Sequence, residues 1–87
     1  MVESSKSLAN RLKLTREALE ISAADLCKRI DVKQNRWSQY ESGERRITTT
    51  VAIRMCDEFG LSLDWIYRGD PSSLPHSLRL KMRKTAA

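Results

Sequence analysis

Residues 7–20 have the hydrophobic spacing of an amphipathic helix. Leu8, Leu12, Thr15 and Leu19 follow one another at intervals of four, three and four residues. Because an α-helix makes one turn in about 3.6 residues, these side chains lie on one face and form a buried stripe. We therefore predict a first helix over 7–20.

Two short helices joined by a tight turn are predicted next. Ser22 is a suitable N-cap for a helix that ends near Ile30. Asp31 then occupies the turn, and a third helix runs over 33–42 until Gly43, which supplies a left-handed stop.

Two further helices complete the predicted domain. Thr48 can cap a fourth helix that Gly60 ends, and a short fifth helix over 63–68 stops at Gly69. The fourth helix has one apolar face, formed by Ala52, Met55, Cys56 and Phe59. This pattern indicates an all-α domain of five helices.

The segment after Gly69 has a different pattern. Residues 70–75 are rich in proline and serine, which predicts a linker, and apolar and basic residues alternate strictly over 78–83. This alternation is typical of a strand, which either pairs with a second copy of the chain or stays a disordered basic tail. We therefore divide the chain into an N-terminal tail (1–6), a domain (7–69) and a linker with a basic tail (70–87).

Length and composition narrow the classes of function. The chain has 87 residues, enough for one modest core, and its net charge of +5 suits an anionic partner. Two cysteines, Cys27 and Cys56, stand at apolar helical positions, and His76 is the only histidine, so we expect buried thiols and neither a metal nor a cofactor. The sequence has no evident group of catalytic residues and no apolar run of membrane-spanning length, so we expect neither an enzyme nor a membrane protein. We expect no small-molecule ligand. Buried, reduced cysteines fit a location in the cytoplasm.

The predicted third helix has an unusual polar face. Trp37, Tyr40 and Glu41 point to one side, whereas the opposite side presents uncharged polar residues, namely Asn35, Ser38, Gln39 and Ser42. Asn and Gln side chains can pair with adenine in the major groove, while an ordinary solvated face favours Lys and Glu. Lys33 and Gln34 stand at the helix start, where a recognition helix meets base edges, and Arg36 on the flank could reach guanine or a phosphate.

Basic residues bracket this helix at the places where DNA phosphates would lie. Lys28 and Arg29 precede the helix, and Arg45 and Arg46 follow it. Taken one by one, each of these residues is as consistent with a role in solubility as with a phosphate contact. Together with the polar face, they favour nucleic-acid binding.

Four segments in this order and spacing give the chain a family resemblance from Leu8 to Gly69. The segments are RLKLTREALEIS, ADLCKRIDV, WSQYESGERR and LSLDWIYRGD. Together they resemble the phage repressor and Cro family of helix-turn-helix regulators, also called the xenobiotic-response-element type. The fold implied is a five-helix, lambda-repressor-like domain.

The resemblance implies roles for individual residues. In that family the start and middle of the third helix contact bases, which implies Lys33, Gln34, Asn35 and Gln39, with Arg36 beside them. The start of the second helix and the loop after the third contact phosphates, which implies Ser22, Ser42, Arg45 and Arg46, and Ser38 is added from the same face. The resemblance also implies a structural ion pair between Arg16 and Glu41.

Three positions depart from the family pattern. Asp31 and Glu20 stand where glycines are usual, and aspartate tolerates the left-handed conformation better than most residues. Ala23 replaces a glutamine that bonds a phosphate in many relatives. None of the three lies on the predicted base-contacting face.

The expected function is sequence-specific regulation of transcription. We expect a repressor that binds an operator in double-stranded DNA as a homodimer, in the cytoplasm of a bacterium or encoded by a phage. Candidate dimer residues are Ile53, Trp65, Tyr67, Leu78, Leu80 and Met82. The alternative is a protein-interaction module, such as an antitoxin or an adaptor.

Overall fold

The computed structural model describes the backbone of residues 5–86, which contains six helical segments and no strand. The segments are α1 (Ser5–Ala18), α2 (Ala23–Ile30), α3 (Gln34–Ser42), α4 (Thr49–Phe59), η1 (Asp64–Arg68, a single π-helical turn) and α5 (His76–Ala86). The all-α prediction is confirmed, and most of the predicted N-terminal tail lies outside the described residues. None of these helices is long and apolar enough to cross a membrane.

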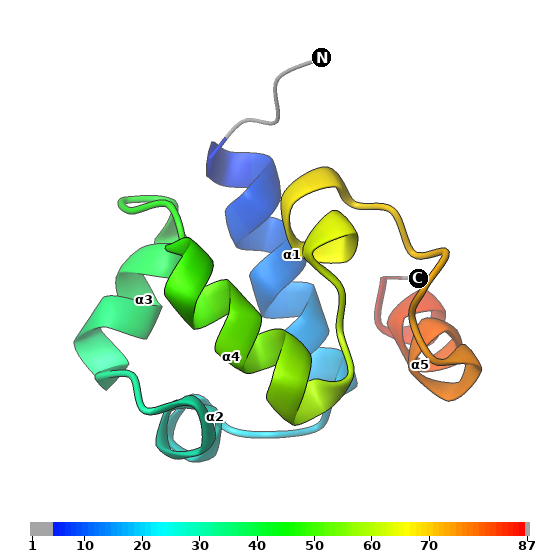
Figure 1. Ribbon diagram of the computed structural model, residues 1–87, viewed down its shortest axis with the longest axis horizontal. Coiled ribbons are helices and arrows are strands. Elements are labelled where there is room, and N and C mark those ends of the chain that lie inside the picture. The colour runs from blue at the N-terminus through cyan, green and yellow to red at the C-terminus, as the bar shows by residue number, and fades with distance from the viewer. Residues whose placement is uncertain (1–4, 87) are drawn as a thin grey trace.

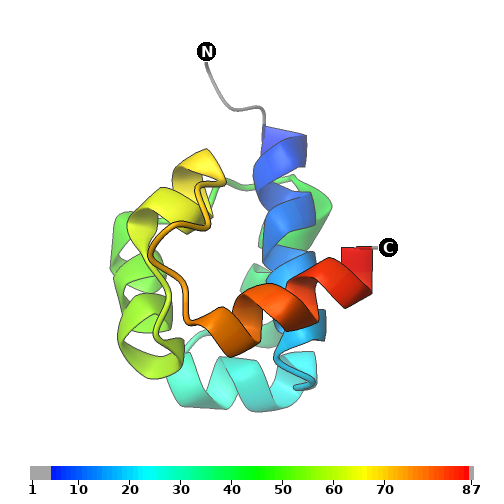
Figure 2. The ribbon, with the colours of Figure 1, turned by 90° about the vertical axis from the view of Figure 1, so that its right-hand side faces the viewer.

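Helix α1 is the centre of the molecule. It contacts α3 on one side and α5 on the other, and it contacts η1 through Arg11 and Thr15, while α2 contacts both α3 and α4 (Figures 1 and 2). The stripe predicted on α1 is buried, since Leu8, Leu12 and Thr15 are each 1 % exposed. Around it pack the other large core side chains, among them Leu26, Ile30, Trp37, Tyr40, Met55 and Ile66.

Local signals start α2 and α4 where the sequence predicts. The Ser22 hydroxyl accepts a hydrogen bond from the Asp25 amide at 3.1 Å, and the Thr48 hydroxyl accepts one from the Val51 amide at 3.3 Å. These side chains satisfy amide groups that a helix start leaves without partners. Helix α1 ends two residues earlier than predicted, because Glu20 adopts a left-handed conformation with φ of 58°.

Both alternatives for 78–83, a strand that pairs with a second copy and a disordered basic tail, are wrong. This segment is the middle of α5, in which Leu78 and Met82 lie one turn apart and are each 6 % exposed, whereas Leu80 is 44 % exposed. Both buried side chains pack into the common core, together with Leu74 from the segment predicted to be a linker. A lone strand leaves its backbone unpaired, while a helix satisfies its own hydrogen bonds and still buries two apolar side chains.

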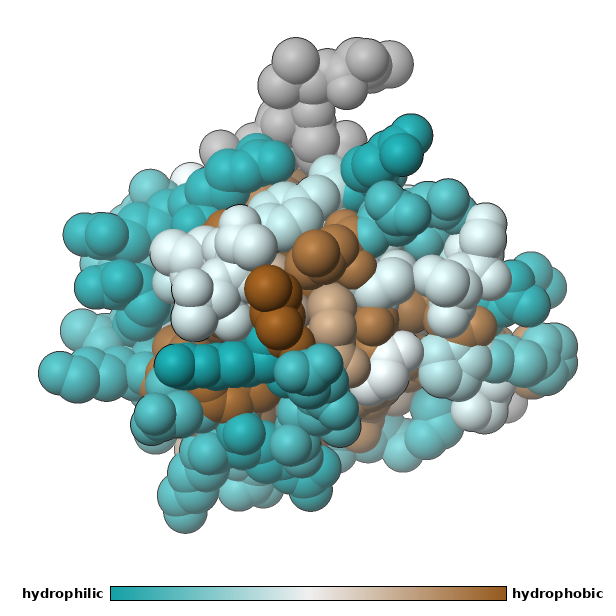
Figure 3. Space-filling model, in the orientation of Figure 1, coloured by the Kyte–Doolittle hydropathy of each residue, from teal (hydrophilic) through white to brown (hydrophobic). Residues whose placement is uncertain are grey.

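Packing within the chain removes some of the predicted dimer residues from the surface. Leu78, Met82 and Trp65 lie in the core of their own chain, where the Trp65 indole Nε1 donates to the Thr15 hydroxyl at 2.9 Å. Ile53 and Leu80 remain exposed, each at 44 %. Figure 3 shows hydrophobic surface near the middle of the face that includes α4, the helix of Ile53, with hydrophilic side chains around it.

Candidate nucleic-acid interface

Helix α3 is held to the core by two aromatic residues. Trp37 and Tyr40 are 1 % and 2 % exposed, and their rings meet edge to face with centroids 6.2 Å apart. Because both rings are buried beneath the helix, the opposite side of α3 is turned to solvent. Trp37 and Tyr40 therefore lie on the side opposite the polar face, as predicted.

An ion pair ties α3 to α1, as the family resemblance implied. Arg16 Nε lies 2.6 Å from Glu41 Oε2, and Arg16 Nη2 lies 3.3 Å from Oε1. The Trp37 indole also donates to Oε2, and Arg16 Nη1 donates to the Ile21 carbonyl at 3.4 Å. The hydrogen bond to Glu41 raises the pKa of Arg16. The carboxylate thus fixes the rotation of α3 about its axis relative to α1.

The solvent side of α3 is polar and carries no charge. We call this side the outer face; its residues are Gln34, Asn35, Ser38, Gln39 and Ser42. All of them are exposed except Gln39, which is half-buried. Asn35 Oδ1 accepts the Arg36 amide at 3.0 Å and the Ser42 hydroxyl donates to the Gln39 carbonyl at 3.1 Å, while no described residue bonds the side-chain amide of Gln34 or Gln39.

The loop after α3 presents two exposed arginines. Arg46 lies over the ring of Tyr67 at 5.5 Å, and the Tyr67 hydroxyl donates to the Ile47 carbonyl at 3.0 Å. Arg45 is held through its backbone, whose amide donates to the Gln39 carbonyl at 3.2 Å. Tyr67, predicted as a dimer residue, is half-buried and positions this loop.

The start of α2 and the start of α3 differ in their capping. Ser22 caps α2 and is exposed, whereas Lys33, at the N-cap of α3, makes no side-chain cap bond. Asn35 Oδ1 accepts the Arg36 amide, but no described side chain accepts the Gln34 or Asn35 amide. These two amides lie at the partial positive charge of the helix start, which favours an anion. Between the two helices, Asp31 adopts the left-handed conformation, with φ of 56°, which aspartate tolerates better than most residues.

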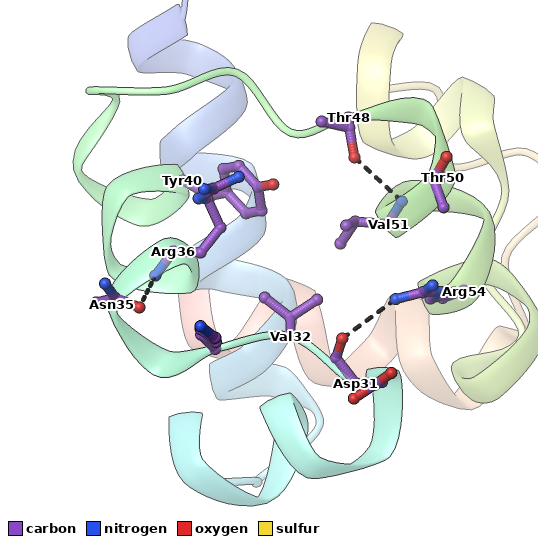
Figure 4. Close-up of a pocket in the computed structure, with 10 residues that line it drawn as sticks. Asp31, Val32, Asn35, Arg36, Tyr40, Thr48, Thr50, Val51 and Arg54 are labelled. Carbon is purple, nitrogen blue, oxygen red and sulfur yellow. Dashed lines mark hydrogen bonds between the residues drawn. The ribbon is translucent and has the colours of Figure 1, made fainter.

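Arg36 lies apart from the outer face. Its side chain stands with Tyr40 at a groove of about 420 Å³ between the start of α3 and the first half of α4 (Figure 4). The groove is lined by Asp31, Val32, Lys33, Asn35, Arg36, Tyr40, Thr48, Thr50, Val51 and Arg54. Arg54 and Thr50 line this groove but are not among the residues predicted from the sequence. Their spacing of four residues places them on one face of α4, but it does not indicate that this face lies next to α3.

A comparison with protein-family models decides the family. The model described as a helix-turn-helix domain matches residues 7–65, which include α2, the turn at Asp31 and α3. The chain belongs to the helix-turn-helix family. A search of curated proteins and a search of solved structures each returned no match.

Membership of this family gives α2 and α3 their places in the motif. In this helix-turn-helix protein α2 is the first helix of the motif and α3 is the second, the recognition helix. Helix-turn-helix domains bind DNA, so the outer face of α3 and its basic flanks belong to a DNA-binding protein. The predicted base-contacting and phosphate-contacting residues are all at least partly exposed and lie on α3 or at its N-cap, at the start of α2 or in the loop after α3.

Proposed function

We propose that this helix-turn-helix protein is a sequence-specific regulator of transcription of the phage repressor and Cro type, with α3 in the major groove of double-stranded DNA. The outer face of α3 is the observation that supports this proposal most strongly. Gln34, Asn35 and Gln39 present amide groups there, and such groups pair bidentately with adenine.

The surroundings of the outer face favour a duplex partner. Arg45 and Arg46 are exposed beyond the end of α3, and Lys33 is exposed at its start. A helix in the major groove has a phosphate backbone on each side, so cations at both ends of the helix fit that position. Ser22, at the start of α2, adds a hydroxyl where the first helix of the motif crosses the backbone.

We further propose that the protein acts as a homodimeric repressor. Ile53 on α4 and Leu80 on α5 are the dimer candidates that keep support, because both are apolar and each is 44 % exposed. A two-fold dimer would bind a palindrome with half-sites about one helical turn apart. Bound there, the protein would act by excluding polymerase, through binding and not through catalysis.

Selection of bound sequences from a random duplex library tests the proposal. We expect an enriched palindrome, bound at least about a thousandfold more tightly than its scrambled form at physiological salt. The triple variant Gln34→Ala, Asn35→Ala, Gln39→Ala should lose this preference, while Asn10→Ala, an exposed amide on α1, should keep it.

Two outcomes would contradict the proposal. The first is no enriched sequence together with equal binding of all duplexes, which would indicate a non-specific binder. The second is stable capture of a protein partner by both the wild type and the triple variant without any binding of DNA, which would favour the interaction module.

A further inference from the structure

The groove between α3 and α4 has an apolar floor and a basic rim. Tyr40 and Val51 at its floor are 2 % and 9 % exposed, and half-buried Val32 lies between them and the turn. Arg36 and Arg54, both exposed, stand on opposite sides of the groove (Figure 4), and exposed Lys33 also lines it. A rigid floor with charged side chains around it can hold a small charged group in one place.

The charges of the lining groups favour an anion. Three cations line the groove, whereas Asp31 is the one carboxylate in its lining, so the formal balance is three minus one, or +2. The hydroxyls of Thr48 and Thr50 add donors at the α4 side. Thr48 also accepts the Val51 amide, which fixes its oxygen at the start of α4.

Arg54 is held in place by the turn of the motif. Its Nη1 donates to the Ile30 carbonyl at 3.3 Å and to the Asp31 carbonyl at 3.1 Å. Among the described residues, no acceptor bonds its Nε or its Nη2, so these N–H groups are available to a ligand. A guanidinium already fixed by one nitrogen loses less side-chain freedom on binding than a mobile one.

The groove is continuous with the outer face of α3. Lys33 and Asn35 line the groove and also belong to the predicted base contacts, and Arg36 follows Asn35 directly. A group bound in the groove therefore belongs to the same stretch of duplex that the outer face contacts. The anionic groups of a DNA duplex are its backbone phosphates, so the anion that fits the groove is a backbone phosphate.

From this geometry we propose that the groove binds one backbone phosphate of the DNA duplex, with Arg36 and Arg54 as its charged donors. The inference rests on the proposed DNA binding, and it moves Arg36 from the base contacts to the phosphate contacts. Arg36 then contributes affinity that does not depend on sequence. Arg54, in addition, links that phosphate to the turn between α2 and α3.

Salt-dependent binding of the selected duplex and of its scrambled form tests the role of Arg36. Loss of one phosphate contact lowers the slope of log K against log salt by about 0.9, which corresponds to about fivefold weaker binding at 0.15 M salt. We expect Arg36→Gln to show this loss equally on both duplexes, and Arg36→Lys to restore the slope. Arg68→Gln removes an exposed arginine of η1 and should change neither quantity.

Replacement of single phosphates by neutral methylphosphonate locates the contact. One position in the duplex should weaken binding to the wild type and leave binding to Arg36→Gln unchanged. Arg54→Lys, which keeps the charge but loses the fork of donors, should reduce the effect at that same position.

Three results would overturn the inference. In the first, Arg36→Gln relaxes the preference at one base pair and leaves the salt slope unchanged, as a base contact would. In the second, every methylphosphonate position affects the wild type and Arg36→Gln alike. In the third, inorganic phosphate shifts the NMR signals of Arg36 and Arg54 in the free protein, but no duplex phosphate couples to Arg36. Equal binding of both duplexes by the wild type would refute sequence specificity instead, and the salt slope would still test the groove.

Discussion

The ion pair between Arg16 and Glu41 allows a quantitative prediction. Arg16→Met removes the two hydrogen bonds to the Glu41 carboxylate, at 2.6 and 3.3 Å, and the bond to the Ile21 carbonyl. The two side chains are only 20 % and 16 % exposed, so the carboxylate left behind is poorly hydrated. Breaking a fully buried pair costs about 3–5 kcal/mol; the residual exposure and the remaining Trp37 donor reduce our expectation to about 2 kcal/mol.

Urea unfolding at neutral pH measures this loss of stability. For a domain of this size, 2 kcal/mol corresponds to a fall in Tm of roughly 10 °C. Glu41→Gln keeps an acceptor for Trp37, so a cycle of Arg16→Met, Glu41→Gln and the double variant isolates the pair, and we expect a coupling energy of about 1.5 kcal/mol.

A matched pair on the surface provides the control. Arg68 and Asp64 lie 3.9 Å apart with 77 % and 60 % of their side chains exposed. Arg68→Met should therefore cost less than about 0.5 kcal/mol. If Arg16→Met costs as little as this control, or if the losses in the cycle simply add, the claim that this pair orients α3 is refuted.

Three further predictions follow from other parts of the fold. In α5, Leu78→Ala and Met82→Ala should each cost about 2–5 kcal/mol in urea unfolding and Leu80→Ala less than about 0.5, whereas equal costs at all three positions would favour the strand pattern. At the left-handed position of Glu20, Glu20→Val should lower stability by about 1–2 kcal/mol relative to Glu20→Gly in the same assay, and equal stability would show that the conformation carries no strain. Burial raises the pKa of the Cys27 thiol, so its contribution to stability is fully present below the ordinary thiol pKa of about 8.5 and is lost as pH rises towards the pKa in the folded state. Above pH 8.5 the wild type should therefore lose stability faster than Cys27→Ala, by at most about 1.4 kcal/mol per pH unit, and parallel curves would contradict the assignment.

The sequence was sufficient for the parts of the fold that local chemistry determines. Ser22, Thr48 and the glycines after α3 and α4 act within one turn of the chain, and the structure has them at the predicted ends. The pair of Arg16 and Glu41 is a long-range contact, and the family resemblance implied it before the structure showed it.

The C-terminal segment shows where a short pattern is ambiguous. Leu78 and Met82 are four residues apart, which fits one face of a helix as well as alternate positions of a strand. Leu80, between them, completes the alternation that is typical of a strand, but its side chain is 44 % exposed and lies outside the core. The choice depends on the packing of α5 against α1, where the two side chains join the core, and no local rule describes that contact.

The groove at Arg36 was missed for a related reason. Arg36 and Arg54 come from helices separated by the loop after α3, and their approach depends on how Tyr40 and Val51 pack. Helical periodicity placed Arg36 at the edge of the outer face and could not tell which neighbour it would meet. Specific arrangements of this kind depend on tertiary contacts that are absent from the pattern of one helix.

The two indole rings make the protein suitable for fluorescence spectroscopy. Trp37 lies beneath the recognition helix and donates to Glu41, whereas Trp65 donates to Thr15 on the side of α1 nearer to η1. Each ring therefore reports on a different part of the molecule. With Trp65 replaced by phenylalanine, the remaining emission would come from the support of the recognition helix alone, so a titration with DNA could be followed at that helix without any added label.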